Sequence, residues 1–363
     1  MNIENNNAKH IYWSKNIRNI EPYVPGEQPK DRKFIKLNTN ENPYPPSPRV
    51  LEALKNFRHE DLRLYPDPNG EELREAVAEY YKVSKAQVFV GNGSDEVLAF
   101  SFMAFFNPMD KPVVFPDITY SFYEVYCKFL RINFNTVDLE EDFSIQVERF
   151  PHDNGGIVIS NPNAPTSLHL DKDRIIALLE RNRDSVVIID EAYIDFGGES
   201  SIDLINKYPN LLVVQTLSKS RSLAGLRIGL AVGDKNLIEG LNAVKDSLNS
   251  YTLDSLALTG AMEAIRDQEY FEDTRSKIIK TRDMTADTLI NLGFKVLPSK
   301  ANFIFASHPV IPAGVLFQRL REEGILVRYF NKTRIDNFLR ISIGTDEEMK
   351  ELAGKIEKIM AGS

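Results

Sequence analysis

The sequence has few of the residues that build disulfide frameworks and metal sites. Its one cysteine, Cys127, excludes an internal disulfide and a cysteine-rich metal centre. The histidines are scattered and show no ligand-like spacing, so we expect no metal site; they are His10, His59, His152, His169 and His308.

Long apolar runs and an excess of basic residues are also missing. No apolar run approaches the roughly 18–20 residues of a membrane span, and the polar first residues contain no apolar segment like that of a signal peptide. Because the formal net charge is -8, we do not expect the basic stripe of a general nucleic-acid binder. These absences predict a cytoplasmic protein that binds neither membranes nor nucleic acid.

What is present predicts a globular protein of two or three domains, since the chain has 363 residues, 42% of them hydrophobic and 26% charged. Residues 1–30 are polar and interrupted by prolines, and we expect an arm that packs on another surface. Short apolar strands alternating with helices predict an α/β domain at 31–255, with a doubly wound, mostly parallel sheet. After a helical stretch at 256–292, long enough to break or bend, the pattern indicates a smaller α+β part, so that the second domain spans 256–363.

The segment 210–229 carries the strongest chemical signal. It begins as a buried strand and leads into Thr216, Ser218 and Lys219, with Arg227 eight residues after the lysine. A lysine at a buried strand end and an arginine among apolar residues both need a compensating partner. A phosphate-bearing aldehyde cofactor would provide one, because the amine forms a Schiff base while the arginine and hydroxyls hold the phosphate. Taken singly, the two residues read as a surface lysine and a core ion-pair partner; together they favour the cofactor.

Polar residues also follow other predicted strands. The strand that ends at Gly91 runs into Gly93, Ser94 and Asp95, where a helix begins and offers free N–H groups to an anion. This glycine pattern is a poor dinucleotide fingerprint but an acceptable phosphate cradle. In doubly wound sheets, ligands bind beyond the carboxyl ends of the strands, and the polar residues that we expect to meet there are Gly93, Tyr120, Asn163, Asp190 and Lys219. For Tyr120, core packing is an equally good interpretation.

Pyridoxal phosphate would give each of these residues a role. Asp190 would keep the pyridine nitrogen protonated, and Tyr193 would hydrogen-bond the phenolic oxygen of the ring. Lys219 would form the Schiff base and then move the substrate's Cα proton, with a pKa lowered by burial and by Arg227. The phosphate would be shared by Arg227, Thr216, Ser218 and the amides of Gly93, Ser94 and Asp95.

Five motifs make the chain resemble the histidinol-phosphate aminotransferase family of class II, fold-type I pyridoxal-phosphate enzymes. They are Thr-Leu-Ser-Lys-Ser-Arg-Ser-Leu-Ala-Gly-Leu-Arg, Ile-Asp-Glu-Ala-Tyr, Asn-Glu-Asn-Pro-Tyr, Tyr-Pro-Asp-Pro and Leu-Arg-Ile-Ser-Ile-Gly-Thr, and they span almost the whole chain. The resemblance implies transfer of an amino group between L-histidinol phosphate and 2-oxoglutarate in histidine biosynthesis, by a homodimer with its sites at the subunit interface.

The resemblance also assigns residues. It implies that Tyr65 reaches the cofactor phosphate of the other subunit, that Tyr120 stacks on the ring, and that Arg340 binds the amino-acid carboxylate of the glutamate half-reaction. Tyr23 and Arg328 match positions near the substrate phosphate, and the motif that contains Asn42 belongs to the substrate side of the site.

Two stretches depart from the family pattern. The usual Asn-Asn-Pro-Thr-Gly is Asn163-Ala164-Pro-Thr-Ser167 here, and the asparagine that normally touches the phenolic oxygen aligns with Ala164. Either Asn163 takes over that contact or Tyr193 carries it alone. The run Ser220-Arg-Ser replaces a small-aromatic-small run after the lysine.

Other functions remain open on the sequence. An aromatic-amino-acid aminotransferase or a decarboxylase of phosphorylated amino acids would share these motifs. A non-catalytic ligand sensor of the same fold is disfavoured because no added DNA-binding domain precedes residue 35. The broken glycine pattern disfavours a nicotinamide enzyme, and Thr216 stands where a serine–lysine hydrolase needs its serine.

Overall fold

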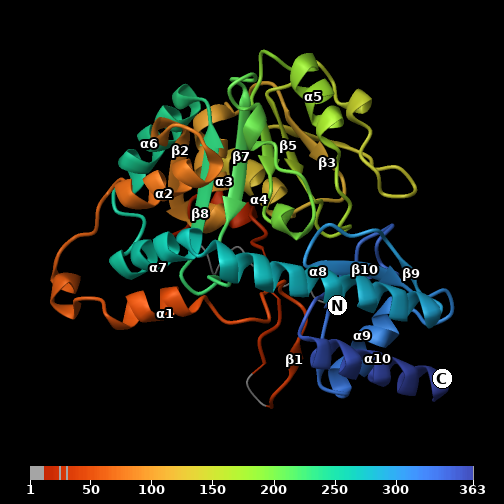
Figure 1. Cartoon of the computed structure of the whole chain (residues 1–363). Helices are drawn as coiled ribbons and strands as arrows, with labels where there is room; N and C mark the ends of the chain where they lie inside the picture. Colours follow the sequence, from red (N-terminus) through yellow and green to blue (C-terminus); the bar gives the residue numbers. More distant parts are fainter. Residues whose placement is uncertain (1–11, 24–25, 30–31, 363) are drawn as a thin grey trace.

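The computed structural model describes residues 12–23, 26–29 and 32–362 (Figure 1). Much of the predicted arm, namely 1–11, 24–25 and 30, lies outside the described residues. Within the described ranges, no helix combines the length and the apolar character needed to span a bilayer.

A seven-stranded sheet forms the centre of the larger part of the molecule, in the order β2-β8-β7-β6-β5-β3-β4. Neighbouring strands are parallel except for β8, which runs antiparallel to both β2 and β7. The predicted mostly parallel α/β sheet is therefore confirmed. Its strands are β2 (Val88–Asn92), β3 (Val113–Pro116), β4 (Phe134–Val137), β5 (Gly156–Ser160), β6 (Val187–Asp190), β7 (Leu211–Thr216) and β8 (Ile228–Gly233).

Helices cover both faces of this sheet. Successive residues of a strand point to opposite sides, so apolar side chains of each strand face the helices on both sides. Ile188 and Leu212 pack with α3, α4 and α6, whereas their neighbours Ile189 and Val213 pack with α1, α2, α5 and α7. Burial on both faces explains why these strands read as continuous apolar runs. The helices are α1 (Pro48–Lys55), α2 (Glu71–Tyr81), α3 (Gly93–Phe105), α4 (Phe122–Leu130), α5 (Lys172–Arg181), α6 (Lys235–Leu248) and α7 (Ser255–Arg266).

The predicted helical stretch 256–292 is two helices. It breaks at Asp267, whose carboxylate accepts a hydrogen bond from the backbone N–H of Tyr270 and so caps α8 (Gln268–Asn291). In Figure 1, α8 runs from α7 toward the part of the molecule that holds α9 (Ala313–Glu322) and α10 (Asp346–Ala361). The expectation that the helical stretch would break or bend is confirmed.

The smaller part is built on a four-stranded sheet in the order β12-β13-β10-β9. Its core joins α8, α9 and α10 to β10 and β13, with Leu37 packed among them. Leu37 follows β1, which falls inside the predicted domain 31–255 but pairs in parallel with β11. The elements are β1 (Ile35–Lys36), β9 (Lys295–Val296), β10 (Phe303–Ser307), α9 (Ala313–Glu322), β11 (Ile325–Leu326), β12 (Arg328–Tyr329), β13 (Leu339–Ser342) and α10 (Asp346–Ala361). The domain boundaries themselves stay a prediction.

Candidate active site

A cavity of about 200 Å³ opens where the carboxyl ends of β5, β6 and β7 meet the start of α3. Arg328 of β12 and Arg340 of β13 line it from the smaller sheet. Most predicted site residues line this cavity, although they come from distant segments: Tyr23, Ser94, Asp95, Tyr120, Asp190, Tyr193, Thr216, Ser218, Lys219, Arg227, Arg328 and Arg340. The predicted residues that do not line it are Asn42, Tyr65, Gly93 and Asn163.

Lys219 follows β7, and its amine points across the cavity to the segment after β1. Nζ donates to the carbonyl of Thr39 at 3.1 Å, and Asn42 fixes the lysine's backbone by donating Nδ2 to its carbonyl at 2.9 Å. Burial, and then the charge of Arg340, lowers the pKa of Lys219 to about 8, with a smaller contribution from Arg227. At a given pH this amine therefore contains more of the neutral, nucleophilic form than a free lysine does.

Asp190 ends β6 and lies behind the cavity in a fully buried position. Its Oδ2 accepts from the hydroxyl of Tyr123 at 2.7 Å, and its Oδ1 accepts from the N–H of Ala192 at 3.2 Å. Burial raises the pKa of Asp190 to about 6, although both hydrogen bonds oppose the shift. A cation next to this carboxylate would stabilise its ionised form.

Tyr193 lines the cavity three residues after Asp190 and packs edge-on against Phe303, with ring centroids 5.0 Å apart. Its oxygen accepts a hydrogen bond from Nδ2 of Asn40 at 3.1 Å. Burial raises the pKa of Tyr193, which keeps the phenol protonated, while Arg340 and Asn40 oppose that rise.

The turn between β2 and α3 lies against Arg227. Gly93 has a left-handed backbone with φ 79°, and a Cβ at this position would come within 2.5 Å of Nη2 of Arg227. Glycine is therefore what allows the guanidinium to lie on the turn. Nη2 of Arg227 also donates to Oδ2 of Asp95 at 3.1 Å, while the hydroxyl of Tyr120 donates to Oδ1 at 2.8 Å.

The donors around this turn suit a phosphate. The first N–H groups of α3 are free of helix partners, and Arg227 adds a guanidinium beside them. The hydroxyls of Thr216 and Ser218, which lie 3.0 Å from each other, complete the group. A dianion bound here would share Arg227 with Asp95.

Arg340 is a buried guanidinium that lines the opposite wall. Nη2 donates to the carbonyl of Asn38 at 2.9 Å, and its Nε is buried without a hydrogen-bond partner among the described residues. Burial lowers the pKa of Arg340 from its usual value, yet an arginine stays charged and needs an anion. Arg328 lies beside it on β12, and both guanidinium groups lie about 5.7 Å from the ring of Phe330.

The loop with the departure from the family pattern presents Ala164, not Asn163, to the cavity. The Asn163 amide is bonded away from the cavity: Nδ2 donates to the carbonyl of Ile118, in the segment after β3, and to the hydroxyl of Thr166 in its own loop, each at 2.9 Å. Its Oδ1 accepts from Thr119 at 3.0 Å. The structure therefore does not bring Asn163 to the ligand space, because its polar atoms join its loop to the segment after β3.

Tyr65 lies on the outside of the molecule. Its side chain is 82% exposed and stacks on Tyr251 with ring centroids 4.6 Å apart. In this chain alone, Tyr65 contributes nothing to the cavity.

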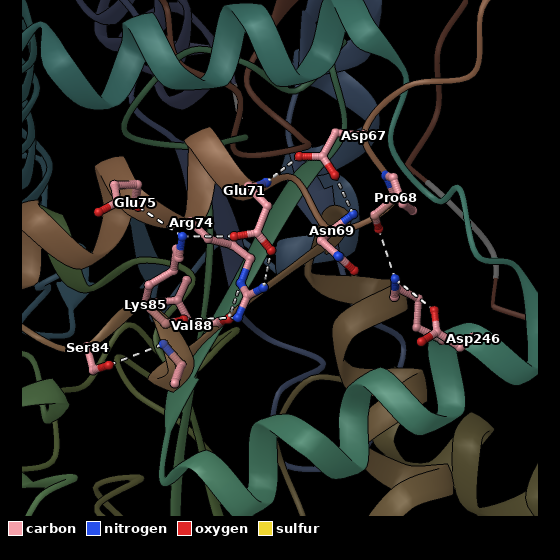
Figure 2. A network of polar contacts seen from close by, with 12 residues as sticks. Asp67, Pro68, Asn69, Glu71, Arg74, Glu75, Ser84, Lys85, Val88 and Asp246 are labelled. Carbon is pink, nitrogen blue, oxygen red and sulfur yellow. Dashed lines mark hydrogen bonds and ion pairs between the residues drawn. The ribbon is translucent and has the colours of Figure 1, made fainter.

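The loop that follows Tyr65 is anchored by a polar network (Figure 2). The Asp67 carboxylate accepts from the backbone N–H groups of Asn69, at 2.9 Å, and Glu71, at 2.6 Å, where α2 begins. The buried amine of Lys245 donates to the carbonyl of Pro68 at 2.8 Å. An exposed aromatic ring on an anchored loop is suited to contact another molecule.

Of the polar residues of the cavity wall that were not singled out from the sequence, three are consecutive: Asn38, Thr39 and Asn40. They directly follow β1 and Leu37, so a polar run after a predicted strand was the available signal. Asn40 is buried, and its Nδ2 holds Tyr193 through the 3.1 Å hydrogen bond to the phenol oxygen.

The donor set of the cavity fits pyridoxal phosphate. An amine with a lowered pKa, a buried carboxylate behind it and a cluster of phosphate donors lie around one space, at Lys219, Asp190 and Arg227. An aldehyde, a pyridinium nitrogen and a phosphate would satisfy these groups respectively.

Comparison with known proteins agrees with this donor set. The family model for aminotransferase class I and II matches residues 32–356. A relative from Clostridium acetobutylicum, named histidinol-phosphate aminotransferase, is 60% identical over 96% of this chain and 99% of its own length. A relative of the same name from Clostridium botulinum is 59% identical over 96% of this chain and 98% of its own length.

Solved structures agree on the fold. Histidinol-phosphate aminotransferase from Sinorhizobium meliloti in complex with pyridoxal-5'-phosphate superimposes with a TM-score of 0.87, covering 96% of this chain and 98% of that one at 23% identity. With the family model matching almost the whole chain and the clostridial relatives so similar, this chain belongs to the class I and II aminotransferase family, in the group of the histidinol-phosphate aminotransferases.

Proposed function

We propose that this chain transfers the amino group of L-histidinol phosphate to 2-oxoglutarate in histidine biosynthesis, with pyridoxal phosphate bound at Lys219. The observation that carries the proposal is the convergence of Lys219, Asp190 and Arg227 on one cavity. Relatives that are 60% and 59% identical bear the name of this activity, which supports the choice of substrate.

When bound, pyridoxal phosphate supplies an aldehyde that captures amines and a ring that takes up the electron pair released at the substrate carbon. Asp190 would face the pyridine nitrogen, Tyr193 the phenolic oxygen and Tyr120 the flat side of the ring. The phosphate would be held by Arg227, Thr216, Ser218 and the amides of Gly93, Ser94 and Asp95.

Lys219 would act twice. Its amine would hold the cofactor, and in the reaction Nζ would take the proton from the substrate carbon that carries the amino group. A pKa of about 8 supports this second role, because a base works best when its pKa lies near the working pH. Thr39 and Asn42 would keep the amine and its backbone in place throughout.

The arginine wall would bind the acidic ends of the substrates. Arg340 would hold the α-carboxylate of glutamate, and its free Nε supports that role. Arg328 and Tyr23 would lie toward the phosphate of L-histidinol phosphate. Selection of a phosphate over an aromatic side chain would then depend on this wall, because histidinol phosphate carries a dianion that phenylalanine lacks.

We also propose a homodimer in which Tyr65 of each chain completes the other chain's phosphate site. Its 82% exposure and its anchored loop support this arrangement. The proposed organisation within one chain is an arm at 1–30, a cofactor domain at 31–255 and a small domain at 256–363. We propose a cytoplasmic location as well, because a biosynthetic transaminase draws on the 2-oxo acids of the cell.

The visible absorption spectrum of the purified protein tests the cofactor. The wild type is expected to show a yellow band that bleaches when L-histidinol phosphate is added. Lys219→Ala should lack the lysine-linked band while still binding added cofactor non-covalently. A colourless wild type that takes up no added pyridoxal phosphate would end the proposal.

Steady-state kinetics test the substrate. We expect kcat/KM to be at least about a hundredfold higher for L-histidinol phosphate than for phenylalanine, which corresponds to roughly 3 kcal/mol from the phosphate contacts. Release of carbon dioxide from phosphorylated amino acids, or equal rates with phenylalanine, would favour a different member of the fold.

A further inference from the structure

The hydroxyl of Tyr193 is held by a chain of hydrogen bonds that begins in the smaller sheet. The hydroxyl of Ser342, at the end of β13, donates to Oδ1 of Asn40 at 2.8 Å. Nδ2 of Asn40 then donates to the oxygen of Tyr193 at 3.1 Å. Asn40 and Ser342 are 1% and 2% exposed, so water does not compete for these bonds.

The direction of each bond is fixed by the backbone. The N–H of Asn40 donates to Oγ of Ser342 at 2.8 Å, so the proton of that hydroxyl goes to Oδ1 of Asn40. With Oδ1 occupied, the amide presents its NH₂ group to Tyr193 and can only donate. Asn40 is itself pinned, because it adopts a left-handed backbone with φ 56° and Nδ2 of Asn302 donates to its carbonyl at 3.1 Å.

A phenol oxygen that accepts a hydrogen bond is left with its own proton to donate. Among the described residues, no side chain or carbonyl accepts the proton of Tyr193, and Tyr193 lines the cavity next to Lys219. The amine of Lys219 lies 5.8 Å from the centre of the Tyr193 ring. On the neighbouring wall Ala164 offers no polar side-chain atom, and the Asn163 amide is already bonded to Ile118, Thr119 and Thr166.

We propose that Ser342 and Asn40 are positioning residues that set Tyr193 as the hydrogen-bond donor to the cofactor's phenolic oxygen. This inference rests on the proposed binding of pyridoxal phosphate at Lys219. Donation to the phenolic oxygen draws electron density from the nitrogen that links Lys219 to the cofactor, so that this nitrogen binds its proton less tightly. Through Ser342, the smaller sheet would thereby influence the protonation of the nitrogen at Lys219, which follows β7 of the larger sheet.

Ser342→Ala is the sharpest test, because Ser342 does not line the cavity. Without its hydroxyl, the Asn40 amide is free to turn its oxygen toward Tyr193, which then donates to Asn40 and no longer to the cofactor. The readout is the pH midpoint of the visible absorption change in the loaded protein without substrate. We expect Ser342→Ala to raise this midpoint by about one pH unit.

Asn40→Gly provides a second variant that preserves the fold. Glycine tolerates the left-handed backbone at this position, and the substitution removes the amide altogether. The midpoint should again rise. The dissociation constant of the cofactor, measured on the cofactor-free proteins, should increase about threefold to tenfold in both variants.

A double-mutant cycle with Tyr193→Phe separates this relay from a general loosening of the smaller sheet. In the Tyr193→Phe background, Ser342→Ala should leave the midpoint unchanged, because no hydroxyl remains to be oriented. Ser299→Ala is the matched control: its hydroxyl donates to the carbonyl of Phe303 in β10, at 2.6 Å, and takes no part in the relay.

The outcomes are distinct. An unshifted midpoint in Ser342→Ala, or the same shift with and without the Tyr193 hydroxyl, overturns the inference while the proposed function stands. A shift in Ser299→Ala as large as that in Ser342→Ala also overturns it. A wild type without a cofactor band overturns the proposed function itself.

Discussion

Burial sets the chemistry of single residues in the cavity. It lowers the pKa of Lys219 to about 8 and raises that of Asp190 to about 6, so both groups are driven toward their neutral forms. The two opposite shifts have the same cause, the loss of water around a charge. A ligand that brings an aldehyde to the amine and a cation to the carboxylate relieves both costs.

The rate of cofactor uptake should therefore follow the titration of Lys219. In the cofactor-free protein, only the neutral amine attacks the aldehyde, so the uptake rate is expected to rise with pH and to reach half its maximum near pH 8. Stopped-flow absorbance measured from pH 6 to pH 10.5 checks this. Arg340→Gln should raise the midpoint, because Arg340 is the charge that most lowers the pKa of Lys219. A midpoint near ~10.4, the value of a free lysine, would contradict the prediction.

At the scale of elements, the turn from β2 to α3 would form the proposed phosphate cradle through its backbone. Gly93→Ala would place a Cβ within 2.5 Å of Nη2 of Arg227 in a left-handed conformation, and so would displace the guanidinium. Losing one charged donor costs roughly 1.5–3 kcal/mol, so the cofactor should bind about tenfold to a hundredfold more weakly. Fluorescence titration of the cofactor-free protein measures the change.

Gly354→Ala is the control for this substitution. Gly354 lies in α10, and apart from its chain neighbours and the backbone of its own helix no atom lies within 4 Å of the Cβ that an alanine would add. This variant should bind the cofactor like the wild type and gain up to about 1 kcal/mol of stability from helix propensity. Unchanged binding in Gly93→Ala would show that Arg227 does not need the glycine.

The end of β6 holds a second buried carboxylate, which faces away from the cavity. Glu191 accepts hydrogen bonds from the hydroxyl of Ser200, the N–H of Ser201 and Nε2 of Gln215, at 2.6, 2.7 and 2.9 Å. Burial nevertheless raises the pKa of Glu191 to about 7. The bonds tie the loop that carries Tyr193 back to β7, where Gln215 lies.

This carboxylate should make stability depend on pH. Between pH 4.5, the ordinary pKa of a glutamate, and about pH 7, the raised pKa of Glu191, the folded protein keeps a proton on Glu191 that the unfolded chain has released. The free energy of unfolding should therefore fall as the pH rises through this window, by roughly 3 kcal/mol from this group. Glu191→Gln should remove that part of the slope in urea unfolding at fixed protein concentration. Equal slopes in the two proteins would contradict the assignment.

At the scale of the whole molecule, a single chain leaves an apolar surface around Tyr65. Leu62 and Leu64 are 56% and 51% exposed just before it, and Tyr251 is 43% exposed beneath it. A second copy would bury these side chains and bring Tyr65 to the other cavity. The proposed dimer would thus cover the apolar surface around Tyr65 and also complete the phosphate site of the other chain.

Mixing two inactive variants tests this sharing. Co-expressed Lys219→Ala and Tyr65→Ala chains would form mixed dimers in which one site has both Lys219 and a partner's Tyr65. With random pairing, the mixture should recover about a quarter of wild-type activity, because half of the dimers carry one intact site. Separately purified chains, each assayed alone, provide the baseline. Activity no greater than the sum of the two baselines would contradict the sharing of Tyr65.

The sequence predicted the site residues that lie at the ends of strands. It missed the residues whose roles depend on the conformation of a loop. Lys219 and Asp190 follow apolar runs, and parallel strands bring such positions to one edge of a sheet. Nothing local separates Asn40 from Asn38 or Asn42, since its role depends on a left-handed backbone and on Ser342, 302 residues away. For the same reason Asn163 looked available, although its amide is bonded to Ile118 and Thr166 and not presented to the cavity.

Pairing of β1 with β11 sets the order in which the cavity assembles during protein synthesis. Thr39 and Asn40 emerge from the ribosome early, but the strand and the serine that hold their segment are translated some 300 residues later. A nascent chain that has reached Lys219 thus has the amine without the wall that faces it. Chains truncated before Ser342 should therefore retain the proposed cofactor less well than the full chain, because Asn40 lacks both of its bonds to that serine.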